Sequence, residues 1–168
     1  EFHIVGGLHP DLPFEYYMDM LKGLKERFPD VHIQAFTAIE LGYLAELAQR
    51  PLDETLIILK EAGLGSIPGG GAEIFAKRVR KKICGEKLIG ENWLHVHETA
   101  HGLGLRSNAT MLYGHLETVE ERADHLVRLR ELQDRTNGFV TFIPLAFHPE
   151  NPVLEFLKTT PGQLDLRA

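Results

Sequence analysis

The string HETAH at residues 97–101 is the most specific catalytic pattern in this sequence, which contains nine histidines. Two histidines four residues apart on a helix place both imidazoles on one face, the spacing with which zinc hydrolases hold their metal. A third ligand is required, and the elongated form of the motif fails because Ser107 stands where the last histidine belongs. Glu117 and Glu120 lie further along as candidates. The motif leaves a zinc hydrolase open, beside the alternative that HETAH is ordinary outer-helix sequence.

Two glycine-rich strings suggest close contact between backbone and ligand. Gly6-Gly7 and the string PGGGAE at 68–73 each follow a short apolar run. Glycine lets a backbone approach a ligand with no Cβ in the way, although a tight turn explains a double glycine equally well. Three consecutive glycines lose much conformational entropy on ordering, so we expect residues 69–71 to contact a ligand. We expect Glu73 to begin a helix, where its carboxylate favours the helix dipole. Neither string matches a Rossmann fingerprint or a P-loop.

An alternation of short strands and helices must position these strings. Apolar runs predict strands at residues 3–5, 31–36, 64–67, 109–113 and 139–147. Apolar periodicity predicts helices after Pro13, after Glu40, and at 53–62, 73–83, 92–103 and 118–133. This order is typical of an α/β protein with a parallel sheet. Five such units fit either a doubly wound sheet or most of a barrel.

Unusual residues fall directly after each predicted strand. The turns are 6–10, 37–40, 68–73, 114–117 and 148–149. In a parallel α/β fold these positions converge at the carboxyl edge of the sheet, and in a barrel that edge carries the active site. Five polar or glycine-rich turns at one edge predict a ligand site there.

Composition narrows the class of protein. A length of 168 residues fits one domain, and the formal net charge of −6 argues against nucleic acid as a partner. No apolar run approaches the roughly 18 residues that cross a bilayer, so we expect no membrane partner. The single cysteine, Cys84, and the lack of a secretory signal favour the cytoplasm. Because the chain begins with Glu1 rather than methionine, and its first residues already indicate a strand, we expect it to be part of a longer protein.

Seven strings together resemble one family over essentially the whole chain. In order they are GGLHP, HIQAFTAIE, AGLGSIPGGGAEIF, RVRKKIC, WLHVHETAHGLG, NATMLYGHLET and FIPLAFHPENP. They are similar to the aminodeoxyfutalosine synthase family, radical S-adenosylmethionine (SAM) enzymes of the futalosine route to menaquinone. The dehypoxanthine futalosine cyclases of that route and the deazaflavin-forming synthases share much of the pattern and are the alternatives. GGLHP and PGGGAE weigh against the deazaflavin branch.

The resemblance implies a fold and an activity. The fold is a partial TIM-type (βα) barrel of the radical SAM superfamily, with about five parallel strands and outer helices. It forms one domain over 1–168 and lacks the N-terminal cluster-binding strand and the C-terminal part. In the family, a reduced four-iron–four-sulfur (4Fe–4S) cluster cleaves SAM to a 5′-deoxyadenosyl radical. That radical adds to the small-molecule substrate, 3-[(1-carboxyvinyl)oxy]benzoate, and rearrangement with loss of a carboxyl group gives aminodeoxyfutalosine.

The resemblance also implies site residues, carried over by position. The double glycine is expected to contact the amino group of SAM, and the expected SAM-binding residues are Gly6, Gly7, His9, Thr110, Tyr113, Ile143 and Leu145. The expected substrate pocket consists of Ser66, Gly69, Gly70, Gly71, Glu73, His115, Glu117 and His148. The resemblance assigns no catalytic base and no oligomeric state.

One departure from the family is decisive for this chain. The family holds its cluster through a C-x-x-x-C-x-x-C motif before GGLHP, and these three thiolates leave one iron free. Here the single cysteine is Cys84, at a different place. We therefore expect this chain alone to bind no cluster and to be inactive. In the family, WLHVHETAH is an outer helix, which weakens the zinc interpretation.

Overall fold

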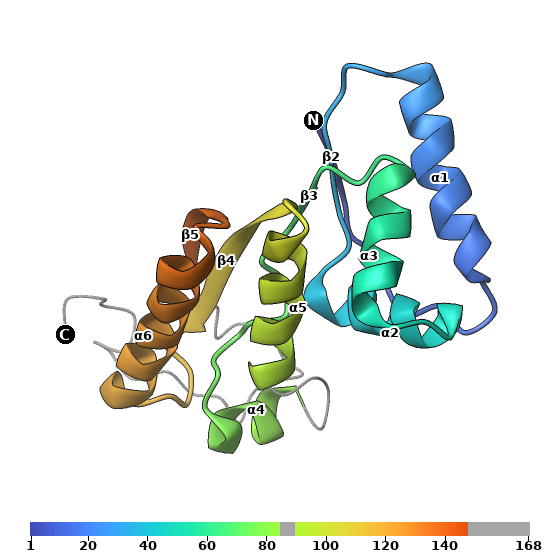
Figure 1. Cartoon of the computed structure of the whole chain (residues 1–168). Helices are drawn as coiled ribbons and strands as arrows, with labels where there is room; N and C mark the ends of the chain where they lie inside the picture. The colour runs from blue at the N-terminus through green and yellow to red at the C-terminus, as the bar shows by residue number, and fades with distance from the viewer. Residues whose placement is uncertain (85–89, 148–168) are drawn as a thin grey trace.

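The computed structural model describes residues 1–84 and 90–147. Within them, five strands alternate with six helices, and Figure 1 shows α1, α2 and α3 grouped around the first strands, with α5 and α6 beside β4. The elements are β1 (Phe2–Ile4), α1 (Phe14–Arg27), β2 (Ile33–Ala35), α2 (Ala38–Ala48), α3 (Leu52–Glu61), β3 (Ser66–Ile67), α4 (Lys77–Ile83), α5 (Gly90–Gly102), β4 (Arg106–Tyr113), α6 (Val119–Thr136) and β5 (Phe139–Ala146).

The five strands form one open parallel sheet in the order β1-β2-β3-β4-β5. Neighbours in the sheet are also neighbours in the chain, whereas the strand order of a doubly wound sheet reverses at a switch point. Sequential parallel strands joined by right-handed crossovers place their helices on one face, as in a (βα) barrel. The predicted α/β fold with about five parallel strands in an incomplete barrel is confirmed.

Local signals account for where the helices begin. Thr37 accepts a hydrogen bond from the backbone N–H of Glu40, and the Glu40 side chain accepts one from the Thr37 N–H, which forms a capping box at α2. Thr118 and Glu121 form the same reciprocal pair at α6. As predicted, α1 begins directly after Pro13, where the missing proline N–H costs nothing.

The hydrophobic core lies between the sheet and its helices. Because side chains alternate along a strand, Ile33 and Ala35 of β2 enter this core, whereas Gln34 faces the opposite side of the sheet. There the Gln34 Nε2 donates to the hydroxyl of Ser66, and His32 contacts that same hydroxyl. The face of the sheet away from the helices is therefore polar at its centre.

The elements predicted at 73–83 and 109–113 begin three or more residues away from their predicted starts, each for a tertiary reason. The expected helix 73–83 begins only at Lys77, and Glu73 has a left-handed backbone with φ of 44°, so it is not a helix-start residue. Its backbone carbonyl instead accepts the N–H of Leu112. The strand predicted from Ala109 begins at Arg106. The polar residues Ser107 and Asn108 belong to the strand because their side chains find hydrogen-bond partners there, His97 for Ser107 and Gln34 for Asn108.

Strand β5 is an edge of the sheet in the described part of the chain. Its apolar side chains Val140, Phe142, Ile143 and Leu145 are exposed. A hollow of about 360 Å³ lies between α6 and the first half of β5, where Val140 and Phe142 line it. In the described ranges, no helix has both the length and the apolar character to pass through a bilayer.

Candidate functional site

A cavity of about 520 Å³ opens on the helix-free face of the sheet, toward the carboxyl ends of the strands. It gathers six residues that the sequence analysis assigned to SAM or substrate, namely Gly6, Gly7, Gly69, Gly70, Thr110 and Ile143. The other lining residues are His3, Val5, Leu8, Thr37, Ile39, Glu40, Pro68 and Asn108. A volume of this size suits a small organic ligand.

The double-glycine turn after β1 needs no glycine for the packing of the chain itself. A Cβ added at Gly7 would meet nothing within 4 Å, and one at Gly6 would meet only Oε1 of Glu40, at 3.5 Å. Neither residue has a positive φ that would demand glycine. The open space beside both residues belongs to the cavity. Close approach of a ligand to the backbone would explain why both positions are glycine.

The glycine loop after β3, residues 69–71, differs from that turn. A Cβ at Gly69 would lie 2.8 Å from the backbone oxygen of Asn108, and one at Gly70 would lie 2.9 Å from Thr37 Cγ2. Gly71 has φ of +86°. The expectation that a ligand explains these three glycines is therefore incomplete, since close packing on β4 and α2 already requires them.

Side chains from three elements hold the carbonyl groups of the glycine loop. The Thr110 hydroxyl donates to Gly69 O at 2.6 Å, and the Trp93 indole N–H donates to Gly70 O at 3.1 Å. The buried guanidinium of Arg80 donates to Gly71 O at 3.2 Å and to Ala72 O at 2.5 Å. The loop is thereby fixed against α4, α5 and β4.

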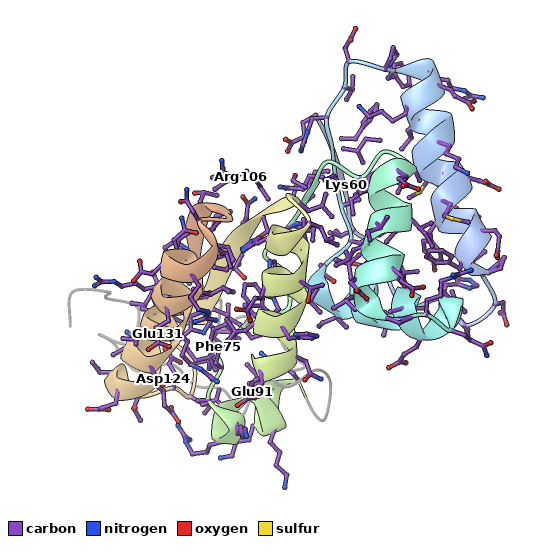
Figure 2. The ribbon with its side chains drawn as sticks, in the orientation of Figure 1. Lys60, Phe75, Glu91, Arg106, Asp124 and Glu131 are labelled. Carbon is purple, nitrogen blue, oxygen red and sulfur yellow. The ribbon has the colours of Figure 1, made fainter. Side chains whose placement is uncertain are left out.

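His125 of α6 locks the end of this loop. Its Nδ1 accepts the backbone N–H of Phe75 at 3.2 Å, so its Nε2 donates to Thr110 O at 2.9 Å. Its ring stacks on Phe75 with centroids 3.9 Å apart, and Figure 2 shows Phe75 between α5 and α6. Burial lowers the pKa of His125 to about 4, so the imidazole is neutral and its tautomer is defined by these two bonds.

The turn after β4 is organised around a buried carboxylate. Glu117 accepts the backbone N–H groups of Gly114, at 2.5 Å, and His115, at 2.9 Å, and the Nε of Arg122 at 2.7 Å. Burial alone would raise the pKa of Glu117, but these backbone hydrogen bonds outweigh it and the pKa is lowered. His115 is also buried, with its Nδ1 accepting the Leu116 N–H and its Nε2 contacting Leu112 O.

The remaining predicted site residues do not line the 520 Å³ cavity. His9 is exposed on the loop before α1, where Tyr43 donates to its carbonyl, and Ser66 is buried, with its hydroxyl accepting a hydrogen bond from Gln34. Tyr113 packs with the small cluster of Ile74, Val79 and Met111, and Leu145 is exposed on β5. Gly71 and Glu73 belong to the turn after β3, of which residues 68–70 line the cavity, whereas His115 and Glu117 belong to the turn after β4, which contributes no residue to the lining. His148 lies outside the described residues.

Glu40 is the carboxylate among the lining residues that the sequence analysis did not assign individually to the site. Its Oε1 accepts the backbone N–H of Gly6 at 2.8 Å, across 34 positions of sequence. The T-x-x-E pattern at 37–40 is a capping-box signal and locates the carboxylate at the start of α2. Its contact with Gly6 depends on the pairing of β1 with β2, which no local pattern reveals.

The HETAH helix does not present a zinc site. His97 Nδ1 and His101 Nε2 both lie 2.8 Å from the Ser107 hydroxyl, which occupies the place between the two imidazoles. Glu98 points outward and pairs with Arg135 at 3.0 Å. In residues 1–84 and 90–147, no three His, Cys, Asp or Glu side chains are grouped to share a metal ion.

The chain does not fit a 4Fe–4S cluster, because that cluster needs three thiolates and the sequence has one cysteine. Cys84 caps the C-terminus of α4 and is absent from the lining of the 520 Å³ cavity.

Comparison with known proteins gives relatives of two kinds. No protein-family model matches the sequence. The aminodeoxyfutalosine synthase of Thermus thermophilus is 57% identical over 150 residues, which cover 89% of this chain and 40% of that protein. The aminodeoxyfutalosine synthase of Streptomyces coelicolor is 47% identical over 88% of this chain and 38% of its own length. The chain therefore spans about two fifths of the length of these relatives.

The second kind of relative is less similar. The 5-amino-6-(D-ribitylamino)uracil–L-tyrosine 4-hydroxyphenyl transferase of Methanopyrus kandleri is 42% identical over 96% of this chain and 44% of its own length. An identity of 57% over nearly the whole chain places it nearer to the synthases. By sequence, therefore, the chain is similar to about two fifths of an aminodeoxyfutalosine synthase, and its identity to the Thermus thermophilus synthase exceeds its identity to the Methanopyrus kandleri transferase.

Proposed function

We propose that this chain supplies the SAM-binding part of an aminodeoxyfutalosine synthase. In the longer protein that we expect to contain it, the 5′-deoxyadenosyl group of SAM is joined to 3-[(1-carboxyvinyl)oxy]benzoate, with loss of a carboxyl group, in menaquinone synthesis. A small-molecule reaction and a single free cysteine favour the cytoplasm as its location.

One observation carries this proposal. Six residues that the family resemblance implies for SAM and substrate surround one cavity. The packing of the chain does not explain why the turn beside this cavity has two glycines. The role of each of these residues remains a prediction. The chain provides no site for the 4Fe–4S cluster of the proposed reaction, so that cluster requires thiolates beyond Cys84.

Ligand binding tests the proposal on the chain itself. Titration calorimetry with SAM and with 5′-deoxyadenosine should give saturable binding of both at one site. Reconstitution with iron and sulfide should produce no cluster absorbance, and a cluster signal would contradict the expectation for this chain. A binding module with another role would take up neither nucleoside.

A catalytic assay separates the two kinds of relative. The full-length protein, reconstituted anaerobically with SAM, should convert 3-[(1-carboxyvinyl)oxy]benzoate to aminodeoxyfutalosine, detected by mass spectrometry. The second candidate, supported by the 42% identity to the Methanopyrus kandleri protein, is transfer of a 4-hydroxyphenyl group from L-tyrosine. Activity with L-tyrosine and 5-amino-6-(D-ribitylamino)uracil, and none with the benzoate, would replace the first proposal by the second.

A further inference from the structure

The 520 Å³ cavity has a rim made by turns and a floor made by strand residues. The rim belongs to the turns after β1, β2 and β3, at residues 6–8, 37–40 and 68–70. The floor consists of the lining residues that lie within strands, namely His3, Asn108, Thr110 and Ile143. His3 comes before the double-glycine turn on β1, and Asn108 comes before Thr110 on β4. These two polar side chains therefore lie further from the carboxyl ends of the strands than the rim does.

His3 and Asn108 face the same side of the sheet. Phe2 and Ile4 pack against the core on the helix side, so the alternation of side chains along β1 turns His3 to the helix-free face. Ala109 belongs to that core, and Asn108 before it points the opposite way. The sheet thus brings an imidazole and an amide, from two strands that are not neighbours, into one cavity.

The two threonine hydroxyls that line the cavity have no donor hydrogen left for a ligand. Thr37 donates its hydroxyl hydrogen to Oε2 of Glu40 at 2.8 Å. Thr110 donates its hydroxyl hydrogen to Gly69 O at 2.6 Å. A hydroxyl group has one hydrogen, so both threonines can only accept further bonds. A ligand group that is itself an acceptor therefore needs another partner.

His3 and Asn108 keep donors for a ligand. Within residues 1–84 and 90–147, the His3 imidazole makes no hydrogen bond or ion pair. The Asn108 amide makes one long bond there, from Nδ2 to Gln34 Oε1 at 3.5 Å, and its second N–H is unused. Gln34 in turn donates to the Ser66 hydroxyl at 3.1 Å, which holds its own amide in place. The side-chain N–H donors of the described lining are therefore those of His3 and Asn108.

We propose that His3 and Asn108 bind the carboxylates of the substrate 3-[(1-carboxyvinyl)oxy]benzoate. This inference rests on the proposed function and gives the second ligand of that reaction a subsite. A carboxylate can only accept hydrogen bonds, and its transfer from water into a cavity is costly unless donors replace the water. The imidazole donates an N–H in both of its protonation states, and when protonated it gives the described lining a positive charge.

SAM carries a carboxylate as well, on the carbon that also carries its amino group. That amino group is expected at the double-glycine turn, which belongs to the rim. The floor residues His3 and Asn108 lie before the turns, within β1 and β4, so we assign them to the substrate. The experiment separates the two carboxylates by measuring both ligands with the same variants.

Titration calorimetry with the benzoate, on the chain saturated with SAM, tests the proposal. His3→Phe keeps an aromatic ring without a donor, and Asn108→Ala removes the amide. We expect each to weaken benzoate binding about tenfold or more, because a hydrogen bond to a charged group is lost. His3→Gln, which keeps an N–H donor, should recover part of the affinity. The dissociation constant of SAM, titrated alone, should stay at the wild-type value in all three variants.

Controls keep the outcomes distinct. His95→Gln removes an exposed histidine of α5 and should leave both affinities unchanged. The dimethyl ester of the benzoate, which has no carboxylate, should bind wild type and variants alike. Circular dichroism checks that every variant is folded.

Three results overturn parts of the argument separately. Weakening of SAM together with the benzoate would assign the floor to the carboxylate of SAM, and overturns the substrate assignment. Unchanged benzoate affinity in either His3→Phe or Asn108→Ala, or a wild type that binds SAM but no benzoate, overturns it too, while SAM binding still upholds the proposed SAM site. A wild-type chain that binds no SAM overturns both proposals.

Discussion

The Nε of Arg122 donates a 2.7 Å hydrogen bond to Oε1 of Glu117, and both side chains are buried. The arginine comes from the first turns of α6, and the glutamate from the turn that follows β4. Together with the backbone N–H groups of Gly114 and His115, this pair gives the turn a fixed conformation. The turn therefore depends on an ionised carboxylate.

Glu117→Gln should destabilise the chain strongly. Breaking a buried charge pair by removing one partner costs on the order of 3 kcal/mol, because the guanidinium remains in its buried place without the carboxylate. Urea denaturation at pH 7 measures the loss, with the exposed Glu131→Gln on α6 as the control. Since the folded pKa of Glu117 is lowered, its contribution is present above the unfolded pKa and is lost as pH falls through the folded value. Equal stability of both variants would show that the pair is unimportant.

Acidification toward pH 5 should destabilise the chain through His125. Burial lowers its folded pKa to about 4, while an unfolded histidine titrates near 6.5, so the unfolded state binds more protons between these values. The free energy of unfolding should fall by about 2 kcal/mol from this residue between pH 7 and pH 5. His125→Gln should be less stable at pH 7 but should show a shallower pH dependence. His95→Gln removes an exposed histidine from α5 as the matched control, and the same slope in all three proteins would refute the assignment.

The two glycine strings should respond oppositely to alanine. Gly69→Ala places a Cβ against the backbone of β4 and should destabilise the chain by about 1–3 kcal/mol. Gly7→Ala meets open space, so the melting temperature should stay close to the wild-type value while SAM affinity falls. Thermal denaturation and calorimetry on the two variants separate the effects. Full SAM affinity in Gly7→Ala would show that no ligand approaches that turn.

The Ser107 hydroxyl should act as a structural bridge between α5 and β4. Ser107→Ala removes the shared partner of His97 and His101, and we expect a loss of about 1–3 kcal/mol in the free energy of unfolding. The comparison is Thr99→Ala, which deletes a hydroxyl of α5 that donates only to the carbonyl of His95 in the same helix. Metal analysis of the purified wild-type chain should show no stoichiometric zinc. Zinc that is present at one equivalent and lost in His97→Ala would restore the hydrolase interpretation.

Much of this fold follows from local rules that a single sequence displays. Pro13 and the T-x-x-E pattern at 37–40 both indicate helix starts from the sequence alone, because capping involves only groups that are close together in the chain. The alternation of apolar runs with periodic helices predicts an α/β class, and the turns after β1, β2 and β3 mark the edge where the cavity lies.

The tertiary structure alone decided which side chains of those turns meet. Glu40 reaches Gly6 because β1 and β2 are paired, and Arg80 and His125 keep Glu73 out of a helix by binding the loop around it. His115 and Glu117 turn inward to satisfy their own loop, and Ser107 joins the two histidines of HETAH. These bonds join residues distant in sequence or depend on how a turn packs, so they cannot be predicted from residue type and spacing. They form because leaving a buried polar group without a hydrogen-bond partner costs free energy.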